Sequence, residues 1–157
     1  MSVAPYVSSP EEVVRKMLDM AQLRRGEALF DLGCGDGRIV VIAARDYQAK
    51  AFGVEIREDL ATGAQQQLRK FHVEERARIV QGNLFDVDLS EADVVTLYLS
   101  LSGNEKLKPK LERELRANAR VVSLDIQIKG WTPIRTSEAP GKHIIYCLLY
   151  TSDAADE

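Results

Sequence analysis

The sequence predicts one α/β domain built on a mostly parallel β-sheet. Short apolar runs alternate with longer amphipathic stretches along the 157-residue chain, which is the order expected when each strand is followed by a helix. A glycine-rich turn separates the first strand from the next helix, and the last two strand-like runs follow each other closely. The length suits a single domain with a substantial core.

The first predicted helix begins at a capping sequence, residues 9–12. Ser9 is the expected N-cap, Pro10 suits the first helical position, and Glu12 completes a capping box. Gly26 suits the left-handed conformation that ends a helix. The next elements are predicted as a strand at Ala28–Leu32, a helix at 36–46, a strand at Lys50–Glu55, a helix at 57–70 and a strand at 78–81.

The second half of the chain begins with an almost entirely apolar run, 92–99, which is typical of a strand covered on both faces. Residues 104–116 have a helical pattern, but we expect an interruption, with a short turn and then a fresh helix from Pro109. A fifth strand is predicted at 120–128. The last two strands, at 132–137 and 142–150, follow too closely for a crossover helix, so we expect a hairpin with one strand antiparallel to the rest.

The composition narrows the classes of function. Apolar residues make up 45% of the chain and charged residues 29%, which is ordinary for a soluble protein. No stretch is long enough to cross a bilayer, and residues 1–12 lack the apolar core of a secretion signal, so we expect a cytoplasmic protein. The two cysteines, Cys34 and Cys147, predict no disulfide framework, and no Cys or His pair has metal-ligand spacing, so no metal is expected.

The final segment, residues 147–157, resembles the translation of a transposase-type sequencing adapter. We therefore take 1–146 as the functional domain and expect a non-native tail that completes or replaces the last strand. The alternative is a genuine strand followed by an acidic tail. Taking its three acids, Asp153, Asp156 and Glu157, from the total of 24 leaves 21 acidic residues against 21 basic ones. A balanced charge predicts no nucleic-acid partner.

Residues 31–38 carry the main functional signal, because they follow a strand and open a helix. Their glycines let a ligand approach the main chain closely, and the helix N-terminus offers free N–H groups. A dinucleotide-binding turn would carry glycine or alanine where Arg38 stands. Asp31, just before the turn, would repel a pyrophosphate but suits the ammonium group of S-adenosylmethionine. We therefore predict this cofactor, bound by Asp31, Gly33, Cys34, Gly35, Asp36 and Gly37.

Polar residues also follow the second and third strands. Glu55, with Ile56 beside it, ends the second strand twenty residues after Gly35, where a carboxylate can accept hydrogen bonds from both ribose hydroxyls. Asn83 follows the third strand and is placed to hydrogen-bond adenine, with Leu84 against the ring. Open α/β sheets bind ligands at the carboxyl ends of their strands, so these residues extend the predicted cofactor site.

The methyl acceptor is expected beyond the fourth and fifth strands. Tyr98 ends the fourth strand and would form an aromatic wall for a cationic or amine substrate. The alternative for Tyr98 is a tyrosine that packs the core. Asp125 has a similar place on the fifth strand and would orient a substrate amine. His72 and His143 are taken as ordinary loop and strand residues, so no general base is assigned.

Several stretches match one family in combination: residues 5–7 with 9–11, 31–38, 53–55, 82–85, 94–99 with Asn104 and 107–111, and 121–123 through Gly130 and Trp131. They resemble small class I S-adenosylmethionine-dependent methyltransferases, similar to archaeal protein-lysine methyltransferases and the mitochondrial ATP synthase c-subunit lysine methyltransferase. This resemblance implies a Rossmann-like, seven-stranded mixed sheet in the order 3-2-1-4-5-7-6, with helices on both faces. It also implies that Tyr6 and Ser9 help to enclose the cofactor.

The same resemblance implies methyl transfer from S-adenosylmethionine to a nitrogen nucleophile, and a lysine exposed on a protein substrate is the expected acceptor. We expect the compact chain to act as a monomer, away from membranes. The alternatives are a small-molecule or ribosomal-component acceptor, an NAD-dependent oxidoreductase, and a non-catalytic cofactor-binding protein. A lysine must first lose a proton, because its pKa is about 10.4; water is the expected proton acceptor.

Overall fold

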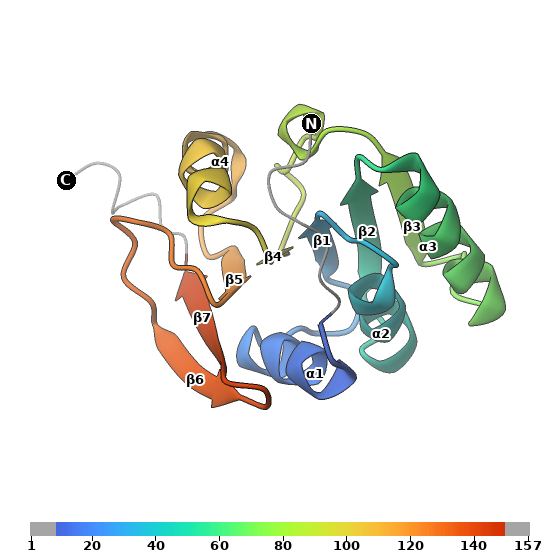
Figure 1. Cartoon of the computed structure of the whole chain (residues 1–157), viewed down its shortest axis with the longest axis horizontal. Coiled ribbons are helices and arrows are strands. Elements are labelled where there is room, and N and C mark those ends of the chain that lie inside the picture. Colours follow the sequence, from blue (N-terminus) through green and yellow to red (C-terminus); the bar gives the residue numbers. More distant parts are fainter. Residues whose placement is uncertain (1–8, 150–157) are drawn as a thin grey trace.

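The computed structural model describes residues 9–149 of the chain. Its centre is one seven-stranded sheet in the order β3-β2-β1-β4-β5-β7-β6, with helices on both faces (Figure 1). The predicted fold class and strand order are confirmed. The strands are β1 (Ala28–Leu32), β2 (Lys50–Glu55), β3 (Ala77–Gln81), β4 (Val94–Leu97), β5 (Arg120–Leu124), β6 (Arg135–Ala139) and β7 (His143–Leu149).

The first five strands are parallel, and the final hairpin supplies the antiparallel strand. β1 pairs in parallel with β2 and β4, and the β2–β3 and β4–β5 pairs are parallel too. β7 lies antiparallel to both β5 and β6. The short connection from β5 to β6 has no helix, so β6 lies at the lateral edge of the sheet and β7 returns between the two. The predicted hairpin is confirmed.

Apolar layers cover both faces of the sheet. α1 (Glu11–Met20), α2 (Arg38–Asp46) and α3 (Glu58–Lys70) share one core cluster with the strands, to which they contribute residues such as Val14, Val40 and Leu68. On the opposite face, α4 (Leu101–Glu114) and the 3-10 turn η1 (Leu84–Asp86) contribute Leu107 and Leu84 to a second cluster. The helices therefore fix the sheet from both sides and leave the ends of the strands to the loops.

The predicted cap of the first helix is wrong by one residue. Pro10 has an extended ψ of 149° and occupies the N-cap position itself, without a side-chain capping bond, so α1 begins at Glu11. Ser9 lies before the cap, and its carbonyl accepts a hydrogen bond from Arg38 Nη1 at 2.8 Å. Proline cannot use its own side chain as a cap, and the contact with Arg38 fixes the entry to the helix instead.

The predicted interruption at Pro109 is also wrong, because α4 runs through it without a break. The Ser100 hydroxyl accepts a hydrogen bond from the Gly103 N–H and starts the helix earlier than expected. Leu107 and Leu111 are completely buried on either side of the proline, whereas Pro109 itself is exposed. The missing N–H therefore falls on the solvent side, and burial of the apolar face keeps the helix continuous.

The fourth and fifth strands are shorter than predicted. β4 ends at Leu97, and β5 ends at Leu124 rather than at 128. Asp125 takes a left-handed φ of 66°, which ends the extended conformation. The Asn104 side-chain amide then donates to the carbonyls of Ile126 and Gln127, so the chain after β5 bonds to α4 instead of continuing the sheet.

β7 includes the first residues of the segment predicted to be non-native. Cys147 and Leu148 are buried and pair with Val122 and Val121 of β5. The rest of the segment, residues 150–157, lies outside the described residues, so its adapter origin stays a prediction. Within residues 9–149, no helix is both long and apolar enough to cross a bilayer, and no three His, Cys, Asp or Glu side chains gather into a metal-binding group.

Candidate active site

Most of the predicted site residues that the structure describes lie at or just after the ends of neighbouring strands. By the register of the sheet, β1, β2, β4 and β5 end side by side, and the antiparallel β7 begins beside them, because Leu124 at the end of β5 pairs with Ile145 near the start of β7. We call this row the site rim. In the spatial order of the strands, its polar side chains are Glu55, Asp31, Tyr98, Asp125 and His143.

The glycine turn after β1 is anchored to β2. The N–H groups of Gly33 and Cys34 both donate to the Val54 carbonyl, at 2.8 and 2.9 Å. Gly37 precedes α2 with a left-handed φ of 85°, and a Cβ at this position would lie 2.9 Å from the Cβ of Ala64 on α3. Glycine alone tolerates this backbone angle together with so close a helix, so any side chain at position 37 would strain the turn.

Asp31 is the buried carboxylate of the site rim. It is only 3% exposed, and its Oδ1 accepts a hydrogen bond from the Thr96 hydroxyl of β4 at 2.8 Å. Burial raises the pKa of Asp31 to about 7; the Thr96 hydrogen bond lowers it, and the nearby Glu55 and Asp36 charges raise it. A ligand ammonium group beside Asp31 would favour its ionised form.

Glu55 joins the end of β2 to the turns on both sides of it. Its Oε1 accepts a hydrogen bond from the Gly35 N–H at 2.9 Å, and its Oε2 accepts one from the Arg57 N–H at 3.0 Å. Each oxygen keeps a further lone pair, so the carboxylate is oriented by the backbone and can still accept hydrogen bonds from ribose hydroxyls. Ile56, the next residue, is half-buried.

Asn83 and Leu84 lie after β3, at the start of η1. The Asn83 Oδ1 accepts a hydrogen bond from the Phe85 N–H at 2.9 Å and so caps this turn. The side-chain NH₂ is then the group that can donate to an adenine nitrogen. Leu84 is buried in the core cluster on the α4 face, and its contact with adenine stays a prediction.

Two residues of the glycine turn use their side chains for support. The Cys34 Sγ lies only 2.7 Å from where a Cβ on Gly53 would stand. Burial, with the charges of Asp31 and Glu55, raises the pKa of the Cys34 thiol, so no reactive thiolate forms there. Asp36 pairs with Arg38 at 2.8 Å. The predicted cofactor contacts of Cys34 and Asp36 would therefore come mainly from their backbone atoms.

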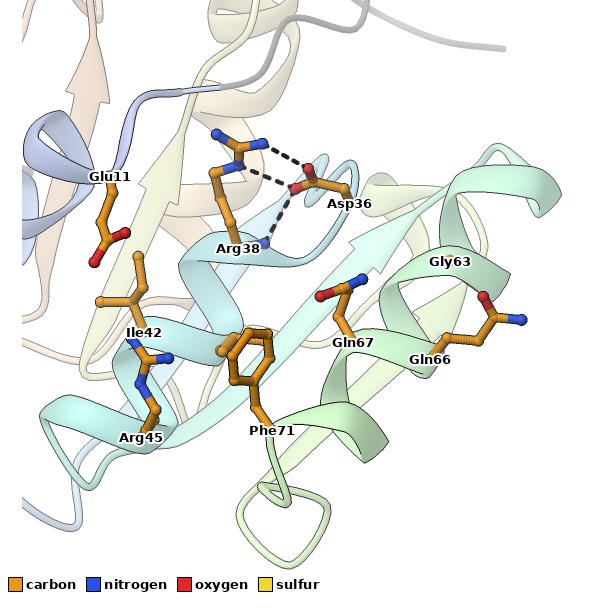
Figure 2. Close-up of a pocket in the computed structure, with 10 residues that line it drawn as sticks. Glu11, Asp36, Arg38, Ile42, Arg45, Gly63, Gln66, Gln67 and Phe71 are labelled. Carbon is orange, nitrogen blue, oxygen red and sulfur yellow. Dashed lines mark hydrogen bonds and ion pairs between the residues drawn. The ribbon is translucent and has the colours of Figure 1, made fainter.

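A pocket of about 380 Å³ opens beside the turn, over α2 and α3 rather than at the strand ends (Figure 2). The Asp36–Arg38 pair borders it near the turn, Gln67 projects from α3, and Arg45 lies with its guanidinium 5.1 Å from the centre of the Phe71 ring. Neither carboxylate of the strand ends lines this pocket, so it is separate from the site rim.

Tyr98, Asp125 and His143 gather at the other end of the site rim. Asp125 Oδ2 lies 2.8 Å from His143 Nδ1, and Asp125 Oδ1 accepts a hydrogen bond from the Ile144 N–H at 2.9 Å. The Tyr98 and His143 rings meet edge to face, with their centres 6.2 Å apart. Burial and the Asp125 charge raise the pKa of the Tyr98 hydroxyl. The structure thus brings the two predicted acceptor residues together.

Two residues that contact the predicted site residues were not assigned from the sequence: Thr96, which bonds to Asp31, and His143, which contacts Asp125. Thr96 is a lone hydroxyl in an otherwise apolar run, and that contrast was a usable signal. His143 has no local signal, because its place depends on the pairing of β7 with β5. Of the two residues expected to enclose the cofactor, Ser9 is buried next to Arg38, and Tyr6 lies outside the described residues.

A Rossmann-like sheet with this strand order, and a glycine turn between two carboxylates at neighbouring strand ends, defines a class I S-adenosylmethionine-dependent methyltransferase. The chain belongs to the family of the ANTKMT methyltransferase domain, whose model matches residues 31–135. The predicted enzyme class and cofactor are confirmed. Family membership also decides against the oxidoreductase and the non-catalytic alternatives.

Individual relatives agree with this assignment. The chain is 47% identical to a protein-lysine N-methyltransferase from Saccharolobus islandicus, over 90% of this chain and 91% of that one. It is 31% identical to the human lysine N-methyltransferase of the ATP synthase c-subunit over 82% of this chain, but spans only 54% of that longer protein. The crystal structure of an RNA methyltransferase from Salinibacter ruber with S-adenosyl-L-homocysteine superposes with a TM-score of 0.89 at 41% identity, covering 92% and 94% of the two chains.

Proposed function

We propose that this chain transfers the methyl group of S-adenosylmethionine to lysine side chains of a protein substrate. The observation that carries the proposal is the relation to the Saccharolobus islandicus protein-lysine N-methyltransferase, because it extends over nine-tenths of both chains. The similar methyltransferases of the ATP synthase c-subunit and of the adenine nucleotide translocase also act on lysine. These relatives differ in the protein they modify and share the acceptor group.

The two ends of the site rim would have different roles: one would bind the cofactor, and the other would receive the lysine. Asp31 and Glu55 would hold the ammonium and ribose groups of S-adenosylmethionine, which supplies an activated methyl group on its sulfonium. Tyr98 would offer a ring face to the incoming lysine, since cations are attracted to aromatic rings. The leaving group is already good, so alignment of the amine and exclusion of water are what the chain must add.

RNA methylation is the second candidate, because the similar Salinibacter ruber protein is described as an RNA methyltransferase. The charge distribution argues against it for this chain, whose net charge is −3. On α4, Lys110 pairs with Glu114 at 2.8 Å, and just beyond the helix Arg116 pairs with Asp93 at 2.7 Å. An RNA-binding face needs basic groups gathered without acids between them.

One assay separates the two acceptors. The protein is incubated with isotopically labelled S-adenosylmethionine and either the nuclease-treated protein fraction or the protease-treated RNA of one cell lysate. We expect mass spectrometry of the hydrolysates to find the label in methylated lysine. Label in methylated nucleosides alone would overturn the proposal. Asp31→Ala, which removes the predicted ammonium partner, is the control that should transfer little label to either fraction.

A further inference from the structure

Asp125 and His143 form a rigid pair at the acceptor end of the site rim. The Asp125 carboxylate contacts His143 Nδ1 at 2.8 Å and the Ile144 N–H at 2.9 Å, through different oxygens. The Asp125 N–H also donates to the Ile144 carbonyl at 2.7 Å. The left-handed backbone of Asp125 is thus held by three contacts with β7, which is more than strand pairing alone requires.

This pair lies next to the predicted cofactor site. Thr96, which bonds to Asp31, is two residues before Tyr98, and Tyr98 meets the His143 ring edge to face. The side chains of His143 and Asp125 are 19% and 30% exposed, so they are shielded yet open to a substrate. A lysine that approaches the methyl group along Tyr98 would therefore meet the histidine.

The hydrogen bond to Asp125 determines which nitrogen of His143 is available. An ionised carboxylate only accepts hydrogen bonds, so in the neutral imidazole Nδ1 carries the proton and Nε2 carries the lone pair. Gly141 lies beside this second nitrogen, and a Cβ there would stand 3.6 Å from Nε2 and 3.3 Å from Cδ2. A side chain at position 141 would press against this edge of the ring, and glycine avoids that contact.

We propose that His143 is the general base that deprotonates the acceptor lysine and that Asp125 is its positioning residue. This inference rests on the proposed lysine specificity. The ammonium N–H bond breaks, the proton moves to Nε2, and the electron pair stays on the amine nitrogen. That pair forms the new bond to the methyl carbon as the carbon–sulfur bond breaks and S-adenosylhomocysteine leaves. The imidazolium, stabilised by Asp125, then releases its proton to water.

Other ionisable groups surround the pair. Asp125 and Tyr98 contact the ring from just beyond β5 and β4, and Lys142 precedes it. On the neighbouring strand β6, Glu138 pairs with Ile144, and its carbonyl accepts a hydrogen bond from Lys16 Nζ of α1. These groups are the same in the wild type and in a variant of residue 143. The ratio of the wild-type methyl-transfer rate to that of the variant, taken at each pH, therefore isolates the contribution of His143.

The test compares His143→Asn with the wild type from pH 7 to pH 10, measured as initial label transfer into the lysate protein fraction. The asparagine amide can still donate to Asp125, but it offers no base. We expect the variant to be about 100-fold slower at pH 7 and within a few-fold at pH 10, where solution itself supplies neutral lysine. His72→Asn, at an exposed residue with a left-handed φ of 56°, is the matched control and should behave as wild type.

Asp125→Asn is the second variant, for use if His143→Asn does not fold. Its side-chain oxygen can still accept from the Ile144 N–H, but its amide would donate to Nδ1 and leave the proton on Nε2, which removes the base. We expect Asp125→Asn to lower the methyl-transfer rate at pH 7 about as much as His143→Asn does, and we expect its difference from the wild type to become smaller as the pH rises. A defect equal at every pH, or smaller than threefold at pH 7, would overturn the inference while lysine methylation by the wild type stands. A wild type that labels no lysine would overturn the proposed function as well.

Discussion

The cofactor end and the acceptor end of the site rim are assembled in different ways. At the cofactor end, Asp31 and Glu55 belong to neighbouring parallel strands, and each carboxylate is oriented by the adjacent strand or turn, through Thr96 or through the Gly35 N–H. At the acceptor end, Asp125 lies just beyond β5 in a left-handed conformation, and His143 comes from a strand of opposite direction.

The difference concerns the relative direction of the strands that supply the cooperating groups, which is parallel at the cofactor end and antiparallel at the acceptor end. Parallel strands followed by helices place each polar group at the end of its own strand, so the cofactor end repeats one local arrangement. The acceptor end depends on a contact between residues 18 positions apart, which exists only because the last hairpin folds back on β5.

The largest effect expected at the cofactor end is a loss of stability with rising pH. Burial raises the pKa of Asp31 to about 7, far above the unfolded value of about 3.9. The stability that such a group contributes is complete below the unfolded pKa and is lost as the pH rises through the folded pKa. From pH 4.5 to 8, the ligand-free wild type should lose about 3 kcal/mol of unfolding free energy relative to Asp31→Asn. Denaturant titrations of both proteins at both pH values measure the unfolding free energies. If the unfolding free energy changes with pH by the same amount in the wild type and in Asp31→Asn, the prediction is wrong.

The places of Asp31, the glycine turn and Glu55 in the fold could be predicted from the sequence, because the first strand, the turn and the helix are consecutive. An acid, a glycine turn and a helix start occupy residues 31–38 in one stretch, and Glu55 stands at the end of the next strand. The contact of Thr96 was not predicted, because its hydrogen bond to Asp31 depends on the register of β4 against β1. That register is a property of the assembled sheet.

The acceptor end and the helix boundaries were predicted less well, for a related reason. Tyr98 and Asp125 follow strands and were identified, but His143 acquires its partner only through the antiparallel pairing of β7. Pro109 was expected to break a helix that the burial of Leu107 and Leu111 keeps whole. In each case a tertiary contact outweighed the local preference.

The rigidity of the glycine turn is tested by Gly37→Ala. A Cβ there would stand 2.9 Å from Ala64 in a residue with a φ of 85°, so backbone strain and the clash with α3 should lower the unfolding free energy by about 2–4 kcal/mol. Gly63→Ala is the matched control, because a Cβ on this α3 residue meets nothing within 4 Å. It should stabilise the protein by about 0.5–1 kcal/mol. Thermal or urea unfolding measures both, and similar losses in the two variants would argue against a rigid turn.

Asp31→Asn also tests whether the cofactor end recognises charge. Loss of a charge-assisted contact to the ammonium group should weaken S-adenosylmethionine binding by about 10- to 100-fold in calorimetry. Because the ionised carboxylate binds, the wild-type affinity should rise as the pH approaches the Asp31 pKa of about 7 and level off above it. The titration of the ligand's own amine is common to both proteins and cancels in their ratio. If the ratio of the wild-type affinity to the Asp31→Asn affinity does not change with pH, Asp31 does not bind the ammonium group.

The smallest effect is expected from Tyr98→Phe, which separates the ring of Tyr98 from its hydroxyl. If the ring face holds the lysine, phenylalanine should keep methyl transfer within about threefold of wild type, whereas Tyr98→Leu should lower it about tenfold, in line with a cation–π contact of roughly 1 kcal/mol. Neither change should alter S-adenosylmethionine affinity, because the carboxylates that would bind it are on β1 and β2. Equal losses of methyl-transfer rate in Tyr98→Phe and Tyr98→Leu would show that the hydroxyl, and not the ring face, holds the lysine. A loss of cofactor affinity in Tyr98→Leu would show that the two ends of the site rim are one unit.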